Sequence, residues 1–381
     1  MKKSYFLISI LCVIFISLNL RAPITAIGPL VDKIMLSYEL NSTQIGILSS
    51  LPLLCFFIFS LIAPILPNTK AIFFAIILII IGLFTRAFFN TFFLFFGTIL
   101  IGLGIAILNV LMPSFIKNNF KNIGKIMAIY GMILSVSSLI GVFGHYLAEY
   151  IGLSGTLFCW VIFAIIALFC YLPFIKNNRL NRKQSLKKFK DFLGIFKNQK
   201  AWIITGFMGL QSCVFYTIIT WYPSILATNL SNDTATNIVI LFQFCAMFSA
   251  YFIPSKMANS SNNTLLLCLV CFSNIFAFFI CLLSSNIYIL IFSALLFSIP
   301  VGGIFGVALT MIAIKSKNSE TTVYLSSMAQ SVGYLIATVG PIIFGYFKDL
   351  SGNFDISIIF MIIISSLLLI FALLSNKISY I

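Results

Sequence analysis

Long apolar stretches recur along the whole chain, and they constrain its fold more than any other feature. A helix needs about 20 predominantly apolar residues to cross the hydrocarbon core of a bilayer. Stretches of this length follow one another through all 381 residues and are separated by short polar segments. We predict twelve membrane-spanning helices, at residues 5–31, 44–65, 71–89, 92–115, 124–148, 152–174, 201–227, 235–254, 264–283, 286–314, 322–347 and 355–376.

The composition agrees with a membrane protein. Hydrophobic residues make up 61% of the chain and charged residues only 8%, whereas about 25% of the residues in a soluble domain are charged. The nine cysteines all fall in apolar segments. We therefore expect them to pack among apolar side chains, and we predict no metal and no cofactor.

The longest polar segment, Lys176 to Lys200, divides the predicted helices into two sets of six. We predict an N-terminal six-helix bundle (1–175), a basic cytoplasmic linker (176–200) and a C-terminal six-helix bundle (201–381). Three pairs of landmarks recur at a nearly constant offset in the two halves: Pro29 and Pro223, Lys117 and Lys315, Gly144 and Gly345. The predicted fold class is an all-α membrane protein of twelve transmembrane helices in two pseudo-symmetric bundles.

Within the linker, apolar residues have the spacing of an amphipathic helix. They are Phe189, Phe192, Leu193 and Phe196, with lysines on the other faces. Such a helix is suited to the anionic inner surface of a membrane. A solvated tether that enforces orientation is an equally good interpretation.

The net charge of +15 is distributed unevenly along the chain. If the predicted spans alternate in direction, most of the 23 basic residues lie on the side of both termini: Lys2, Lys3, Lys70, Lys117, Lys121, Lys125, the cluster within 176–200, Lys256, Lys315, Lys317 and Lys377. Cytoplasmic loops of membrane proteins carry this excess. We predict that both termini are cytoplasmic, and we attribute the charge to topology, with no nucleic-acid partner.

Arg21 is a cation within the first predicted span, in the segment LNLRAPITAIGPL. Burial in a span costs a guanidinium at least a few kcal/mol, so such a residue normally faces a wet cavity or a partner. None of the eight acidic residues lies in the middle of a span. An anionic or strongly dipolar ligand, an aromatic face and backbone carbonyls remain as partners, and a gating role is an alternative to ligand contact. Arg86, near the outer end of the third span, is expected to reach the lipid headgroups.

Prolines within the spans suggest breaks in the helices. A proline has no N–H to donate to the carbonyl four residues earlier, so that carbonyl needs another partner in a membrane. The predicted helix-breaking residues are Pro23, Pro29, Pro113, Pro223 and Pro341. Interrupted helices at matching places in two halves indicate a central binding site in transporters.

Several polar side chains within the same spans are candidates for contact with a ligand. Three pairs are four residues apart and so share a helix face: Arg21 with Thr25, Ser212 with Tyr216, and Gln330 with Tyr334. The predicted substrate-binding residues are Arg21, Asn19, Thr25, Asn109, Gln211, Tyr216, Trp221, Gln330 and Tyr334. Packing or hydrogen bonding between helices is the alternative role for each one except Arg21.

Four sequence blocks resemble a known family. They are NLRAPITAIGPL, GIAILNVLMPSFIKNNF, GLQSCVFYTIITWYPSIL and LSSMAQSVGYLIATVGP, in the first, fourth, seventh and eleventh spans. Together with the two sets of six spans and the basic central loop, they resemble the major facilitator superfamily, and within it the cyanate and 2-nitroimidazole transporter branch. The resemblance implies the major facilitator fold and no enzymatic activity.

The function expected from residues and resemblance together is transport of a small anion or polar heterocycle by alternating access. The small-molecule substrate and the lipid bilayer are the expected partners, with the proton as a candidate coupling ion and a monomer as the expected state. Export of a larger metabolite, siderophore or drug is the alternative within transport. A membrane enzyme would need a cluster of acid, base or metal-binding groups that the spans lack, and a receptor that does not translocate is a further alternative. Heavy use of Asn, Lys and Ile indicates a bacterial cytoplasmic (inner) membrane as the location.

Overall fold

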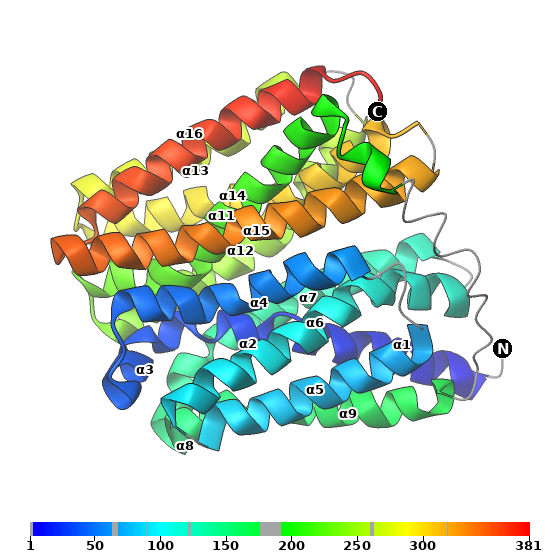
Figure 1. Ribbon diagram of the computed structural model, residues 1–381. Helices are drawn as coiled ribbons and strands as arrows, with labels where there is room; N and C mark the ends of the chain where they lie inside the picture. Colours follow the sequence, from blue (N-terminus) through cyan, green and yellow to red (C-terminus); the bar gives the residue numbers. More distant parts are fainter. Residues whose placement is uncertain are drawn as a thin grey trace. The chain divides into compact units, whose positions relative to one another are not determined.

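The computed structural model describes residues 3–62, 68–88, 90–120, 123–175, 192–259, 263–317 and 319–381. These residues are almost entirely helical (Figure 1). Eleven of the described helices are long and apolar enough to cross a membrane, and Ile129–Val142 is a shorter apolar helix. The chain forms two compact units: unit 1 comprises Met1–Tyr38 and Leu51–Ser185, and unit 2 comprises Glu39–Ser50 and Leu186–Ile381.

Unit 1 begins with a first span that is divided into short helices. Its elements are α1 (Lys3–Asn19), α2 (Ala22–Thr25), the 3-10 helix η1 (Gly28–Leu30), α3 (Val31–Tyr38), the later part of α4 (Ser42–Ile62), α5 (Asn68–Phe88), α6 (Thr91–Asn119), α7 (Ile123–Val142), α8 (Gly144–Cys159), α9 (Val161–Tyr171) and the 3-10 helix η3 (Leu172–Phe174). Helix α5 packs along α6, α9 lies against α1 and α5, and α7 lies against α1 and α2. The divided first span is thus covered by α7.

The fifth and sixth predicted spans meet inside α8. Gly152 has φ 71° and ψ 174°, which is not helical, so the chain turns there. This backbone region is accessible to glycine without a steric penalty. The turn directly follows the boundary expected between the spans 124–148 and 152–174, and it divides the apolar stretch Gly144–Phe174.

Unit 2 contains the first turns of α4 together with α11 (Gln199–Ala227), α12 (Asn232–Asn259), α13 (Thr264–Leu283), α14 (Ile287–Lys315), α15 (Ser319–Ser351) and α16 (Asp355–Lys377). Helix α11 packs along α15, α12 along α14, and α13 against both α14 and α16 (Figure 1). Asparagine side chains cap the starts of α11 and α14: Asn198 accepts from the N–H of Lys200 at 2.9 Å and Asn286 from that of Tyr288 at 2.9 Å. These caps fix where two of the spans begin.

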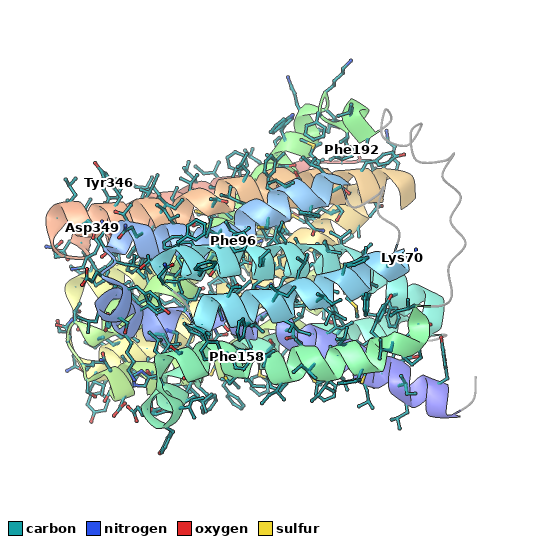
Figure 2. The ribbon with its side chains drawn as sticks, turned by 60° about the horizontal axis from the view of Figure 1, so that its bottom comes forward. Lys70, Phe96, Phe158, Phe192, Tyr346 and Asp349 are labelled. Atoms are coloured by element: carbon teal, nitrogen blue, oxygen red, sulfur yellow. The ribbon has the colours of Figure 1, made fainter. Side chains whose placement is uncertain are left out.

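The start of α4 is held against the end of α15. Asp349 accepts hydrogen bonds from the backbone N–H groups of Ser42 (3.0 Å) and Thr43 (2.7 Å) and from the hydroxyl of Thr43. A carboxylate is favourable at a helix N-terminus because it satisfies exposed N–H groups and the helix dipole. Figure 2 labels Asp349 at one end of α15 and Phe192 near the other.

Small residues allow this close approach of α4 and α15. A Cβ added at Gly345 would overlap the carbonyl oxygen of Ser42, and one added at Gly46 would overlap that of Pro341. The hydroxyl of Ser50 donates to the carbonyl of Thr338 at 2.8 Å. Backbone contact of this kind is typical of helix pairs in membranes.

We expect Gly345→Ala to destabilise the protein by about 1–3 kcal/mol, because the new methyl group would push two backbones apart. Gly131→Ala is the matched control, since no described atom outside the adjacent backbone of its own helix lies within 4 Å of a Cβ there, and it should be neutral or stabilising by up to ~1 kcal/mol. Thermal unfolding in detergent measures both. Equal melting temperatures for the two variants would contradict the close contact.

The described end of the linker packs on unit 2. The ring centroid of Phe192 lies 5.4 Å from that of Phe196 and 6.2 Å from that of Tyr324, and Phe192 is buried. The indole of Trp202 donates to the carbonyl of Phe196 at 2.8 Å. Phe189 and the rest of residues 176–191 lie outside the described residues, so the amphipathic helix stays a prediction there.

Candidate functional site

The first span breaks at the segment that contains Arg21. Helix α1 ends at Asn19 and α2 begins at Ala22, with Arg21 as its N-terminal cap residue. Pro23 stands in the first turn of α2, and Pro29 lies in η1. A proline is accommodated at the start of a helix because its missing N–H is not needed there. The break therefore falls at the two prolines expected to interrupt this span.

Helix α7 supplies partners for the backbone at the break. The hydroxyl of Ser137 donates to the carbonyl of Leu18 at 2.6 Å and accepts from the N–H of Ala22 at 2.8 Å. The hydroxyl of Thr25 lies 3.2 Å from the carbonyl of Ser138 and 3.1 Å from that of Arg21. These bonds satisfy polar groups that would be costly in lipid, and they give Thr25 a structural role beside its predicted one.

Arg86 of α5 also donates to the backbone at the break. Its side chain is 1% exposed, and it donates to the carbonyls of Pro23 (2.8 Å) and Leu157 (3.3 Å). The expectation that Arg86 reaches the lipid headgroups is wrong. The guanidinium is retained inside unit 1 because a broken helix leaves carbonyl oxygens that need donors, and an arginine offers five.

Arg21 itself is partly buried. Its charge interacts with the phenol of Tyr130 on α7, which is 8% exposed. The Tyr130 hydroxyl lies 3.5 Å from Oδ1 of Asn109 on α6. The structure thus places Tyr130 against Asn109, a predicted residue, and within electrostatic range of Arg21.

Asn19 lies at the end of α1, two residues before Arg21. Its amide nitrogen donates to the carbonyl of Phe15 at 2.7 Å. Its side chain is 2% exposed, and within the described part of the chain its Oδ1 has no hydrogen-bond partner. Such an atom in a buried position is a natural acceptor for a water molecule or a ligand donor.

Tyr130 was missed by sequence reasoning, although a pattern in α7 could have revealed it. Tyr130, Ser137 and Gly141 are seven and four residues apart, which places them on one helix face. Gly141 allows α7 to approach α2 closely, since a Cβ there would overlap the hydroxyl of Thr25. A serine and a glycine on the face of a tyrosine indicate a helix that packs closely on a polar neighbour.

Five of the predicted residues lie in unit 2, on α11 and α15. The rings of Tyr216 and Tyr334 are in edge-to-face contact with centroids 6.4 Å apart, and both side chains are buried. The amide of Gln211 donates to the hydroxyl of Ser212 at 2.6 Å. The amide of Gln330, which is partly buried, donates to the hydroxyl of Ser326 at 2.9 Å.

Trp221, the fifth of these residues, is packed within unit 2. It is buried, its indole N–H donates to the carbonyl of Pro341 at 3.1 Å, and its ring stacks on Phe344 with centroids 5.6 Å apart. These contacts join α11 to α15 and give Trp221 a structural role.

Three of the predicted helix breaks are not seen. Helices α6, α11 and α15 continue without interruption through Pro113, Pro223 and Pro341. The prediction that these prolines divide their spans is wrong. A long helix keeps its other hydrogen bonds when one proline removes a single N–H, and neighbouring helices in a membrane compensate for the loss.

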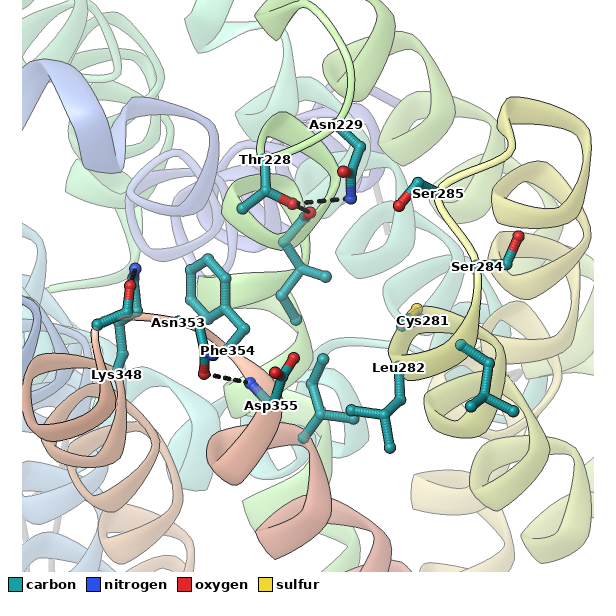
Figure 3. A pocket seen from close by; sticks show the side chains of 14 residues that line it. Thr228, Asn229, Cys281, Leu282, Ser284, Ser285, Lys348, Asn353, Phe354 and Asp355 are labelled. Atoms are coloured by element: carbon teal, nitrogen blue, oxygen red, sulfur yellow. Dashed lines mark hydrogen bonds between the residues drawn. The ribbon is translucent and has the colours of Figure 1, made fainter.

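A pocket of about 350 Å³ opens in unit 2, at the end of α11 and the start of α16 (Figure 3). Two of its polar groups already have local partners: Lys348 donates to the carbonyl of Gly352 at 2.8 Å and stands over the ring of Phe354, and the N–H of Asp355 donates to Asn353 at 3.1 Å. None of the predicted site residues lines it. We therefore do not assign the substrate site to this pocket.

Comparison with known proteins decides the family. The model of the Major Facilitator Superfamily matches residues 7–341. The chain belongs to this superfamily. As a superfamily member, it is a multi-pass membrane transporter and not an enzyme.

Curated superfamily members resemble this one along almost their whole length. "Uncharacterized transporter YycB" of Bacillus subtilis (strain 168) is 32% identical, with 92% of this chain and 89% of that protein covered. The "2-nitroimidazole transporter" of Escherichia coli (strain K12) is 30% identical, with coverage of 96% and 94%. The "Cyanate transport protein CynX" of the same organism is 21% identical, with 91% of each protein covered. The predicted resemblance to this branch of the superfamily is confirmed.

Solved structures of superfamily transporters share the fold. A mutant of the nucleoside transporter NupG has a TM-score of 0.76 at 14% identity, with 97% of this chain and 99% of that chain covered. A bacterial homologue of the human lysosomal transporter Spinster, in an inward-facing and occupied conformation, has a TM-score of 0.75 at 14% identity, with coverage of 99% and 98%. At these identities the likeness establishes the fold, whereas the substrate depends on the site.

Proposed function

We propose that this transporter moves a small anion, or a small polar heterocycle that can carry a negative charge, by alternating access. The observation that carries the proposal is the position of Arg21 at the break of the first span, within electrostatic range of Tyr130, whose hydroxyl lies 3.5 Å from Oδ1 of Asn109. A guanidinium and a phenol both present hydrogen-bond donors. Donors and positive charge together favour an anion over a cation.

The relatives support the same substrate class. One is named for the transport of cyanate, a small monoanion, and another for that of 2-nitroimidazole, a small planar heterocycle. The four candidate residues of unit 2 that keep a predicted binding role, Gln211, Tyr216, Gln330 and Tyr334, are neutral. Arg21 of unit 1 is therefore the charged residue among the candidates, and the preference for an anion depends on it.

We also propose a location and a coupling. The transporter lies in the cytoplasmic membrane of a bacterium as a monomer with both termini inside, because most basic residues lie on that side of the spans. No carboxylate lies in the middle of a span. A proton coupled to transport would therefore accompany the bound anion and would not be carried by a carboxylate side chain within a span.

Uptake into proteoliposomes tests the substrate class. The purified protein is reconstituted, and the uptake of radiolabelled cyanate and of a labelled 2-nitroimidazole is followed with and without an inward proton gradient, against protein-free liposomes. We expect saturable uptake that other small monoanions inhibit and that an inward proton gradient increases. Absence of uptake of both compounds by folded protein would overturn the proposal and favour export of a larger molecule.

A further inference from the structure

Helix α7 presents one polar face to the broken first span. Ser137 on this face bridges the carbonyl of Leu18 and the N–H of Ala22, the two ends of the break. Tyr130 lies on the same face seven residues earlier, about two turns along the helix. The contacts of Ser137 therefore fix the position of Tyr130 relative to the backbone that carries Arg21.

Among the described residues, the hydroxyl of Tyr130 has one long hydrogen bond, to Asn109. Its distance of 3.5 Å to Oδ1 of Asn109 exceeds the usual range of about 2.5–3.0 Å for an O–H···O hydrogen bond. The side chain is only 8% exposed, and a buried hydroxyl without a good partner is unfavourable. A ligand atom that accepts a hydrogen bond from this hydroxyl at a normal distance would remove that unfavourable free energy.

The charge of Arg21 determines which kind of ligand atom can accept the hydrogen bond of Tyr130. Arg21 interacts electrostatically with Tyr130, so any group placed between them lies in the field of a guanidinium. An acceptor with negative charge gains from both the cation and the phenol donor. The positive charge of the guanidinium would repel a ligand cation and would disfavour a ligand hydrogen-bond donor.

We propose that Tyr130 is a further substrate-positioning residue, whose phenol hydroxyl donates a hydrogen bond to the negatively charged end of a ligand bound at Arg21. This inference rests on the proposed function and narrows it. The ligand is a monoanion small enough to accept from a guanidinium and a phenol at once. Asn109 holds the phenol oriented when no ligand is present.

The test is Tyr130→Phe, which removes one oxygen atom and keeps the ring. We expect KM for cyanate uptake to rise about 10-fold or more, because a hydrogen bond to a charged group is lost, while the maximal rate stays within about two-fold. Tyr171→Phe is the matched control. Tyr171 is a fully buried tyrosine of unit 1 that packs against Phe115 and Phe174, and its loss of a hydroxyl should leave KM unchanged.

A second measurement does not depend on transport. With 3-fluorotyrosine at position 130, addition of cyanate should shift the fluorine resonance, and the shift should disappear in Arg21→Gln. Suppose that the wild-type protein takes up cyanate. An unchanged KM in folded Tyr130→Phe, or the absence of a fluorine shift, would then overturn the role of Tyr130 and leave the proposed function standing. If the wild-type protein shows no cyanate uptake and the fluorinated protein shows no fluorine shift, the proposed function and the role of Tyr130 are both overturned.

Discussion

Replacing Arg21 by glutamine is expected to lower kcat/KM for cyanate uptake by about 10- to 100-fold. Glutamine keeps a hydrogen-bond donor on a shorter side chain and removes the charge at the break of the first span. A hydrogen bond to a charged group contributes about 1.5–3 kcal/mol, and about 1.4 kcal/mol corresponds to a factor of ten. Initial rates of uptake into proteoliposomes at several cyanate concentrations measure the effect.

Two comparisons separate binding from folding in this experiment. Arg21→Lys keeps the charge without the planar fork of donors and should lie between wild type and Arg21→Gln. The melting temperature should change less than in Arg86→Met, because Ser137 and Arg86 still pair with the backbone at the break. Wild-type kcat/KM in Arg21→Gln would show that the anion binds elsewhere.

Replacing Arg86 by methionine is expected to destabilise the whole protein by about 3 kcal/mol or more. The variant removes the donors to the carbonyls of Pro23 and Leu157. An unsatisfied buried polar group costs about 1–3 kcal/mol, and water is absent from the bilayer core. We expect a fall in the melting temperature in detergent of roughly 5 °C or more.

The control for Arg86→Met is Lys70→Met on the same helix. Lys70 is exposed in the first turn of α5, so the substitution removes one positive charge without removing a buried contact. It should leave the melting temperature within about 1 °C, as surface substitutions do. Equal melting temperatures for Arg86→Met and Lys70→Met would show that the carbonyls find other partners.

The fold could be predicted from the sequence because its signals are local. Apolar length identifies the spans, and the break at Pro23 follows from the chemistry of one residue type and its place near the end of α1. The same signal misled at Pro341, where the helix continues. Whether a proline divides a helix depends on how neighbouring helices pack around it, and no local pattern contains that information.

The candidate site could be predicted only in part for the same reason. Arg21 was identifiable because a charge within a span is rare. The burial of Arg86 depends on Pro23 and Leu157, which are distant in sequence, so its environment required the structure. Tyr130 is one of 14 tyrosines, and only its place beside Arg21 and Asn109 distinguishes it from the others.

The break in the first span has a consequence for how a ligand would lose its water. Arg86 and Ser137 pair with the carbonyls of Pro23 and Leu18 directly, within the protein. These carbonyls therefore stay paired whether the space beside Arg21 is hydrated or dry. On the proposed function, a ligand that binds at Arg21 would then replace water at the guanidinium without leaving these two carbonyls unpaired.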